Sequence, residues 1–207
     1  MKIYDISRSI GKETPIYPGD PAFELNFVKK LSVQGLNVSR MALGLHTATH
    51  CDAPSHHVKN GRTIEKIDLE KCLGWCRVVN MTNVKAEIEI KDIKRIRPKA
   101  GEIIIFRTKN SLAKTKRFDK TFVSLSEAAA RFLVKSKIKA VGIDGPSIKK
   151  FRLRPDSIHP LLLRAGIPIY EGLQLAAVKP KNYFFVGLPL KIVGAEASPV
   201  RAILIYS

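Results

Sequence analysis

The segment His46-Thr-Ala-Thr-His50-Cys-Asp52-Ala-Pro54-Ser-His56-His57 contains four of the five histidines in this chain of 207 residues. Two interpretations compete: a metal site with a proton-transfer residue beside it, or a polar stretch that happens to contain imidazoles. A helix would bring only His46 and His50 onto one face, and the threonines and Pro54 disfavour a helix interior. In an extended chain the side chains alternate, so His46, His50, Asp52 and His56 share one face. The spacing therefore favours an extended segment.

A straight strand would not bring these groups together. The α-carbons of His46 and His50 would lie roughly 13 Å apart in a regular strand, whereas zinc–nitrogen bonds measure about 2.0–2.1 Å. We therefore expect the chain to bend near Ala48 and again at Pro54, because bends of this kind commonly lie beside active sites.

Imidazole and carboxylate groups in this arrangement suit a catalytic metal site. His46, His50 and Asp52 would supply three ligands and leave a position for water, and the donor set fits zinc, iron, nickel or manganese. His56 would lie beyond the ion but close enough to transfer protons. On the alternating pattern His57 faces the other way, and we assign it no role. A single histidine is more often structural, but three in phase with an aspartate make coincidence a weaker explanation.

The composition is that of an ordinary globular protein, and we expect one domain spanning residues 1–207. The first residues lack the apolar stretch of a signal peptide, and no uncharged apolar run reaches the roughly 20 residues that span a bilayer. These features lead us to expect a cytoplasmic protein. The three cysteines, Cys51, Cys72 and Cys76, do not suggest a disulfide framework, and we expect Cys72 and Cys76 to be buried free thiols.

A formal net charge of +18 dominates the composition. The basic residues are distributed over several short runs (residues 91–99, 114–117 and 149–154), and aromatic residues make up only 7% of the chain. A solvated basic surface is therefore our expectation. Nucleic-acid binding on an inactive hydrolase scaffold is the alternative outside the enzymes, and a structural protein stabilised by metal is another.

Alternating and β-branched runs predict eight strands, and helix signals are clear in two places. We expect a helix at Leu125–Ser136, where Ser124 and Glu127 have capping-box spacing, and a shorter one at Asp156–Ala165, which Gly166 would end. The pattern predicts an α/β or α+β fold with a mixed sheet. The predicted strands are Lys2–Ile6, Phe23–Leu31, Val38–Leu45, Cys76–Met81, Glu102–Thr108, Ala140–Ile143, Tyr183–Val186 and Arg201–Tyr206.

At this point the sequence resembles a known family. The pattern His46-x-x-x-His50-x-Asp52-x-Pro54-x-His56 is similar to the HxGTHxDxPxH signature of the cyclase-like metal hydrolases, the family that includes bacterial-type kynurenine formamidase. Further similar segments follow in the family's order and cover most of the chain. They are Thr14–Asp20, Val141–Ser147, the regions around His159 and Glu171, Gly187–Leu190 and Ser198–Ala202.

The resemblance implies a swivelling β/β/α-type fold and a centre that holds two divalent ions, zinc by preference or manganese. The residues matching His46, His50 and Asp52 bind one ion in the family. Those matching Asp52, His159 and Glu171 bind the second, and the residue matching His56 donates and accepts protons. A residue matching Tyr17 contacts the substrate. Relatives are typically oligomers, which implies a homodimer or a larger assembly.

The implied activity is hydrolysis of a carbon–nitrogen bond by water that the metal activates, with His56 as general acid and base. N-formylkynurenine or a related aryl formamide is the leading substrate, and another linear or cyclic amide or lactam is the alternative. Three departures from the family affect the site. Ala48 replaces a glycine and would be strained if φ is positive there, Tyr17 replaces a common tryptophan, and Lys149–Lys150 replaces a stretch where an aspartate is frequent.

Overall fold

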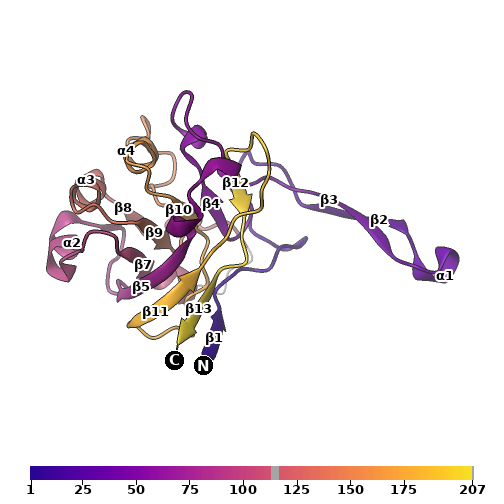
Figure 1. The fold of residues 1–207 in the computed structure, drawn as a ribbon, viewed down its shortest axis with the longest axis horizontal. Coiled ribbons are helices and arrows are strands. Elements are labelled where there is room, and N and C mark those ends of the chain that lie inside the picture. The colour runs from indigo at the N-terminus through magenta and orange to yellow at the C-terminus, as the bar shows by residue number, and fades with distance from the viewer. Residues whose placement is uncertain (113–116, 207) are drawn as a thin grey trace.

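A nine-stranded mixed sheet forms the body of the molecule (Figure 1). The computed structural model describes residues 1–112 and 117–206, so most of the basic run at 114–117 lies outside the described residues. The strands of the sheet, in chain order, are β1 (Lys2–Asp5), β4 (His50–Asp52), β5 (Leu73–Asn80), β7 (Ile103–Arg107), β9 (Ala140–Ile143), β10 (Ile169–Glu171), β11 (Asn182–Val186), β12 (Ala197–Pro199) and β13 (Ile203–Tyr206).

The strands lie side by side in the order β1-β13-β11-β5-β7-β9-β10-β4-β12. The central strands β5, β7, β9 and β10 are parallel, and every other neighbouring pair is antiparallel. Pairing of β1 with β13 brings the two chain ends together (Figure 1). The predicted α/β class with a mixed sheet is confirmed, and all six strands predicted within this sheet are present to within a few residues.

The central strands are buried on both faces, as parallel strands usually are. In β7, Ile104 and Phe106 pack in one apolar cluster while Ile103 and Ile105 pack in another on the opposite face. The helices α2 (Ile90–Ile96), α3 (Glu127–Lys135) and α4 (Ile158–Arg164) belong to the first cluster and lie together along one side of the sheet (Figure 1). A short parallel pair, β6 (Glu87–Ile88) with β8 (Ser124–Leu125), adjoins them.

Two details of the helices differ from expectation. The helix α3 is capped by Ser126, whose hydroxyl accepts the amide hydrogen of Ala129, because Ser124 pairs in β8. The helix α2 was not predicted, since its basic sequence shows only Ile93 as a fully buried position. The helix α4 ends where expected, at Gly166 with a φ of +68°.

The second apolar cluster is enclosed by the curled sheet on its other face. Its large members include Tyr170, Tyr183 and Phe185, each almost fully buried. The three cysteines are buried free thiols, as expected for Cys72 and Cys76. Among the described residues, no helix has the length and apolar character needed to cross a membrane.

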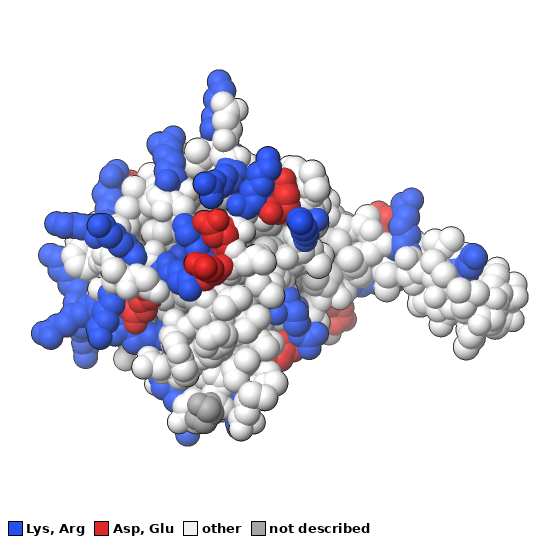
Figure 2. All heavy atoms as spheres, viewed as in Figure 1, with Lys and Arg blue, Asp and Glu red and all other residues white. Residues whose placement is uncertain are grey.

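A two-stranded arm projects from this body (Figure 1). It consists of β2 (Glu24–Lys29), a single helical turn α1 (Leu31–Gln34) and β3 (Val38–Ala42), and both strands were predicted. Every residue of these three elements is exposed. In Figure 2 the end of the arm is mostly uncharged, whereas basic side chains are dense on the body.

Candidate metal centre and adjoining cavity

The strand β4 carries the first two candidate ligands, and its neighbour β10 adds a third. His50 and Asp52 project to the same face of β4, as the alternation predicts. Glu171 lies directly opposite His50 in the antiparallel pair of β4 with β10, so the two side chains also share a face. Nε2 of His50 lies 3.4 Å from an oxygen of Asp52 and 3.4 Å from an oxygen of Glu171. All three side chains are buried.

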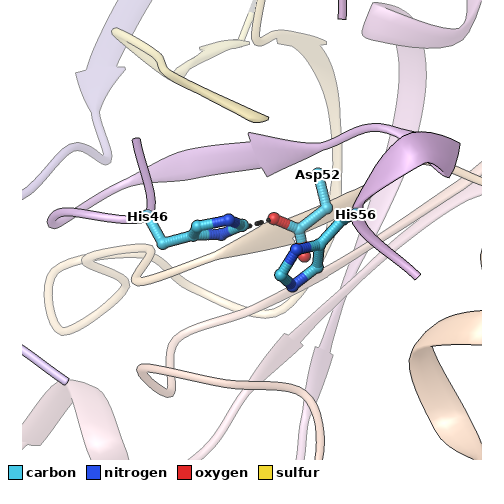
Figure 3. A group of neighbouring side chains, drawn as sticks. All are labelled: His46, Asp52 and His56. Carbon is cyan, nitrogen blue, oxygen red and sulfur yellow. Dashed lines mark ion pairs between the residues drawn. The ribbon is translucent and has the colours of Figure 1, made fainter. Parts of the chain in front are cut away.

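A sharp bend brings His46 to the same point. The chain is extended only from His50 to Asp52 and bends before it, at Ala48, where φ is +60°. The predicted bend is therefore confirmed, and so is the strained conformation expected of an alanine in place of glycine. The bend allows Nδ1 of His46 to approach within 3.0 Å of an Asp52 oxygen. Figure 3 shows the imidazoles of His46 and His56 beside the Asp52 carboxylate.

The bend fits closely against β10. The Thr49 hydroxyl donates a hydrogen bond of 2.6 Å to the carbonyl of Gly172. Gly172 itself has a φ of +65°, and a Cβ there would overlap the backbone of Ala48. A glycine at 172 is thus required where the bend passes the residue that follows Glu171.

The helix α4 supplies His159 from the other side. Its Nε2 lies 3.1 Å from one Glu171 oxygen and 3.7 Å from an Asp52 oxygen. The other ring nitrogen donates to a carboxylate oxygen of Asp156 at 2.8 Å. In His50, similarly, Nδ1 donates to the carbonyl of Ala48 at 3.1 Å. Because a carbonyl can only accept, this bond fixes the tautomer of His50 and leaves its Nε2 for the cluster.

The buried donors of this cluster fit a divalent cation. Nε2 of His50 and both carboxylate oxygens of Asp52 are buried without a partner in hydrogen-bond geometry, although they lie within ion-pair distance of their neighbours. Unpartnered buried polar atoms are costly in a native protein. Two overlapping groups, one of His50, Asp52 and Glu171 and one of His46, Asp52 and His56, each place three ligand atoms within 4.8 Å of one another. Nitrogen and carboxylate donors at such spacing are typical of transition-metal sites.

The electrostatics of the same residues show strong mutual stabilisation. Burial opposes protonation of His50, but the adjacent carboxylates of Asp52 and Glu171 raise its pKa to about 10. Burial likewise opposes protonation of His159, but Asp156 and Glu171 raise its pKa to about 10. Burial likewise opposes ionisation of Glu171, but the neighbouring histidines lower the pKa of that carboxyl to about 2. The pKa of Asp52 is held well below its usual range by His46 and His50, against the effect of burial. Two positive charges thus face two negative ones in a water-poor site.

His56 lies at the end of a 3₁₀ turn, η1 (Pro54–His56), which is the second predicted bend. Its ring centre is 4.2 Å from that of His46 and 5.6 Å from that of His159. Burial lowers the pKa of His56 to about 4, so the imidazole is neutral near pH 7 and can accept a proton. The expectation that His56 lies beyond an ion bound by His46 and Asp52 stays a prediction; a ring nitrogen of His56 lies within 4.8 Å of ligand atoms of both residues.

The prediction that His57 faces away from the site was wrong. The 3₁₀ turn breaks the alternation, and the His57 ring stacks on that of His159 with centres 4.8 Å apart and an interplanar angle of 17°. Its Nε2 lies 3.5 Å from Asp156. Asp156 was itself missed as a site residue. The available signal was its position at the start of a predicted helix, where it accepts the amide hydrogens of Ile158 and His159.

A cavity of about 480 Å³ adjoins the cluster, with His46, Ala48 and Gly172 in its wall. Tyr17 and Phe118 line it, and Phe151 packs against both rings; contact of Tyr17 with a substrate stays a prediction. The ring centre of Tyr17 lies 5.0 Å from that of Phe118 and 5.6 Å from that of Phe151. The two phenylalanines were not predicted, since they follow basic runs without a distinguishing pattern. The cavity is of a size that suits a small organic ligand.

Comparison with known proteins identifies the family. Residues 4–150 match the family described as putative cyclase. A kynurenine formamidase of Salinibacter ruber is 30% identical over 99% of this chain and 97% of its own length, and one of Sphingopyxis alaskensis is 32% identical over 98% and 97%. The structure of a "predicted metal-dependent hydrolase" of Bacillus stearothermophilus is 35% identical, covers 98% of this chain and 97% of its own, and superposes with a TM-score of 0.87. The chain therefore belongs to the putative cyclase family, and the resemblance read from the sequence is confirmed.

Proposed function

We propose that this protein is a metal-dependent hydrolase that cleaves the carbon–nitrogen bond of an amide, with aryl formamides as the leading substrates. One observation carries the proposal: buried donors of His50, Asp52 and Glu171 converge beside an aromatic cavity. The names of the relatives, kynurenine formamidase and metal-dependent hydrolase, support the same reaction class.

Two divalent ions, zinc by preference or manganese, fit this donor set. His46, His50 and Asp52 would hold one ion, and Asp52, His159 and Glu171 would hold the second, with Asp52 shared. A divalent cation at such a site polarises a carbonyl oxygen and lowers the pKa of a bound water towards about 7. The support is geometric. His46 and His50 lie 3.0 and 3.4 Å from one Asp52 oxygen, whereas His159 lies 3.7 Å from the other oxygen. Glu171 lies 3.1 Å from His159 and 3.4 Å from His50.

The protein's own residues would position the amide and move protons. The neutral imidazole of His56, whose pKa is lowered by burial, would accept a proton from the attacking water and return one to the leaving nitrogen. Tyr17 would contact the aromatic ring of the substrate, since ring-to-ring contacts favour aryl groups. The cavity next to His46 would keep that ring beside the cluster.

A hydrolysis assay with a His56→Ala variant tests the proposal. The protein loaded with zinc or manganese should hydrolyse N-formylkynurenine or formanilide, and His56→Ala should lower kcat/KM by about 10²- to 10⁴-fold. Metal content, measured by mass spectrometry of the purified proteins, should be equal in both. Absence of hydrolysis across formamides and cyclic amides would overturn the proposed function. Loss of metal in the variant would make His56 a ligand instead.

We also propose that the protein forms a homodimer through its arm. Eight large apolar side chains of the arm are 39–75% exposed, and an isolated two-stranded hairpin has little stability in water. A second copy is the fitting partner, since reciprocal contact of two arms would cover both apolar surfaces at once. These side chains are Leu25, Phe27, Val28, Leu31, Val33, Leu36, Val38 and Met41. The cytoplasmic location stays a prediction.

A further inference from the structure

Arg8 lies in the wall of the cavity that adjoins the metal cluster. Its Nε donates to the carbonyl of Gly172 at 3.2 Å, and its Nη2 donates to the carbonyl of Asp144 at 3.0 Å. Its backbone amide donates to the hydroxyl of Thr49 at 2.8 Å. Arg8 is therefore held beside the bend at Ala48, with its backbone bonded to Thr49 and its guanidinium bonded to Gly172 and Asp144.

The charge of Arg8 has no carboxylate partner in the part of the chain that the structure describes. The nearby carboxylate of Asp144 instead accepts hydrogen bonds from Thr108 and Ser111. Both acceptors of Arg8 are neutral carbonyls, and they use one edge of the guanidinium. None of the residues described in the structure bonds to the outer edge, which consists of Nη1 and the second hydrogen of Nη2. This edge has the fork geometry that binds a carboxylate through two parallel hydrogen bonds.

Within the described ranges, 1–112 and 117–206, no ion pair joins Arg8 to another charged side chain of the cavity wall. Asp119 accepts from the amide and hydroxyl of Thr121 at 2.7 Å each, and Glu13 and Arg117 each have an interaction of their own. Asp144 is the nearby negative charge and opposes the effect of burial on the pKa of Arg8, but it forms no direct ion pair with the guanidinium. A partly buried positive charge that has no directly bonded carboxylate and borders a cavity is expected to bind an anionic ligand group.

From this geometry we infer that Arg8 binds a carboxylate, or a similar anionic group, on the substrate. Arg8 would thereby be a specificity-determining residue that selects acidic aryl amides over neutral ones. The inference rests on the proposed function, because the cavity that Arg8 lines is the one beside His46 and Tyr17. The aromatic ring would lie against Tyr17, and the anionic group would extend to Arg8.

Matched substrates test this inference. Formanilide and the 2-, 3- and 4-isomers of formamidobenzoate differ by a single carboxylate, so the ratio of their kcat/KM values isolates its contribution. We expect the wild-type protein to prefer one of the acids by at least tenfold. The Arg8→Gln variant should lower that ratio by about ten- to a hundredfold, and Arg8→Lys, which keeps the charge but loses the fork, should fall between. Arg131→Gln is the control: it removes an exposed charge on α3, outside the cavity, and should leave the ratio within twofold of the wild-type value.

Equilibrium binding separates this inference from the proposed function. Calorimetry should show that benzoate binds the wild-type protein at least tenfold more tightly than benzyl alcohol does, and that Arg8→Gln loses this preference. That result would support the role of Arg8 even if no formamide were hydrolysed. A wild-type protein without preference for any acid in either assay would overturn it. An equal loss of affinity or kcat/KM for acidic and neutral ligands in Arg8→Gln would also overturn it, because it would show that Arg8 only supports the fold. If Arg8→Gln does not fold, the same ratio is measured with Arg8→Lys.

Discussion

At the scale of single residues, the orientation of His159 depends on Asp156. The Asp156 carboxylate accepts from Nδ1 of His159 at 2.8 Å and also lies 3.5 Å from His57 and 3.8 Å from Lys149. Burial favours the neutral acid, but His159 lowers the pKa of Asp156 to about 2. The side chain is therefore an anion that holds the proton of His159 on Nδ1 and directs Nε2 to Glu171. Such carboxylate–histidine pairs commonly support metal ligands.

We predict that Asp156→Asn weakens divalent metal binding by about 10- to 100-fold. Asparagine can still accept the amide hydrogens that begin α4, so the change removes the negative charge without removing the helix cap. The metal affinity is measured by competition with a chromophoric chelator. Asp92→Asn is the matched control, because Asp92 caps α2 away from the cluster and its variant should bind metal as the wild type does. Equal affinities in all three proteins would contradict the role given to Asp156.

At the scale of secondary structure, the strands that were predicted are those with a long enough apolar run of their own. The strands β7 and β9 can be predicted without knowing their neighbours in the sheet, because their continuous apolar, β-branched sequences indicate burial on both faces. The three-residue strands β4, β10 and β12 carry no such signal, because their conformation depends on each other. The alternation of side chains along an extended chain placed His50 and Asp52 correctly. It failed at His57, because the 3₁₀ turn η1 interrupts the extended backbone there. Glu171 was reachable only through resemblance, since β10 is far from β4 in the chain.

The arm leads to a prediction at this same scale. Replacing Phe27 and Val33 by glutamate should convert a dimer into a monomer of 23.1 kDa, because each side chain is more than half exposed in the single chain and buried charges weaken an apolar interface. Light scattering after size exclusion measures the mass. Trp75→Glu is the control, since Trp75 is an exposed apolar residue of the body, and this variant should stay dimeric. A monomeric wild type, or a dimeric arm variant, would refute the proposed interface.

At the scale of the whole molecule, the net charge of +18 did not identify the function. Basic side chains are spread over the face of the body that Figure 2 shows, whereas the cluster at Asp52 concentrates carboxylates and imidazoles in the interior. Charged side chains on the surface are solvated and can vary without changing the packing of the fold. The net charge therefore could not distinguish a hydrolase from a nucleic-acid binder. The internal cluster, in contrast, affects the stability of the entire protein, because its protonation is coupled to folding.

The coupling of the cluster to folding gives a prediction about pH and metal. The pKa values of His50 and His159 are about 10 in the folded protein, above the 6.5 of an ordinary histidine. The folded state therefore binds more protons than the unfolded state between these values. The resulting stabilisation is complete below about pH 6.5 and is lost as the pH rises towards 10, at up to about 1.4 kcal/mol per pH unit for each group. A bound cation requires both imidazoles to be neutral, so metal should bind more tightly as pH rises.

We therefore expect metal-stripped protein to lose stability between pH 7 and pH 9, and metal-loaded protein to lose much less. Urea unfolding at pH 7, 8 and 9, with zinc or with a chelator, measures the difference. Calorimetric titration of the stripped protein with zinc at pH 7.5, in buffers of different ionisation enthalpy, should show release of about two protons per chain. His57→Gln serves as the control, since burial lowers the pKa of His57 and its imidazole is already neutral at pH 7.5. Proton release should thus be the same in this variant. If zinc binds without releasing protons, His50 and His159 do not carry the charges assigned to them, and the electrostatic account of the cluster is wrong.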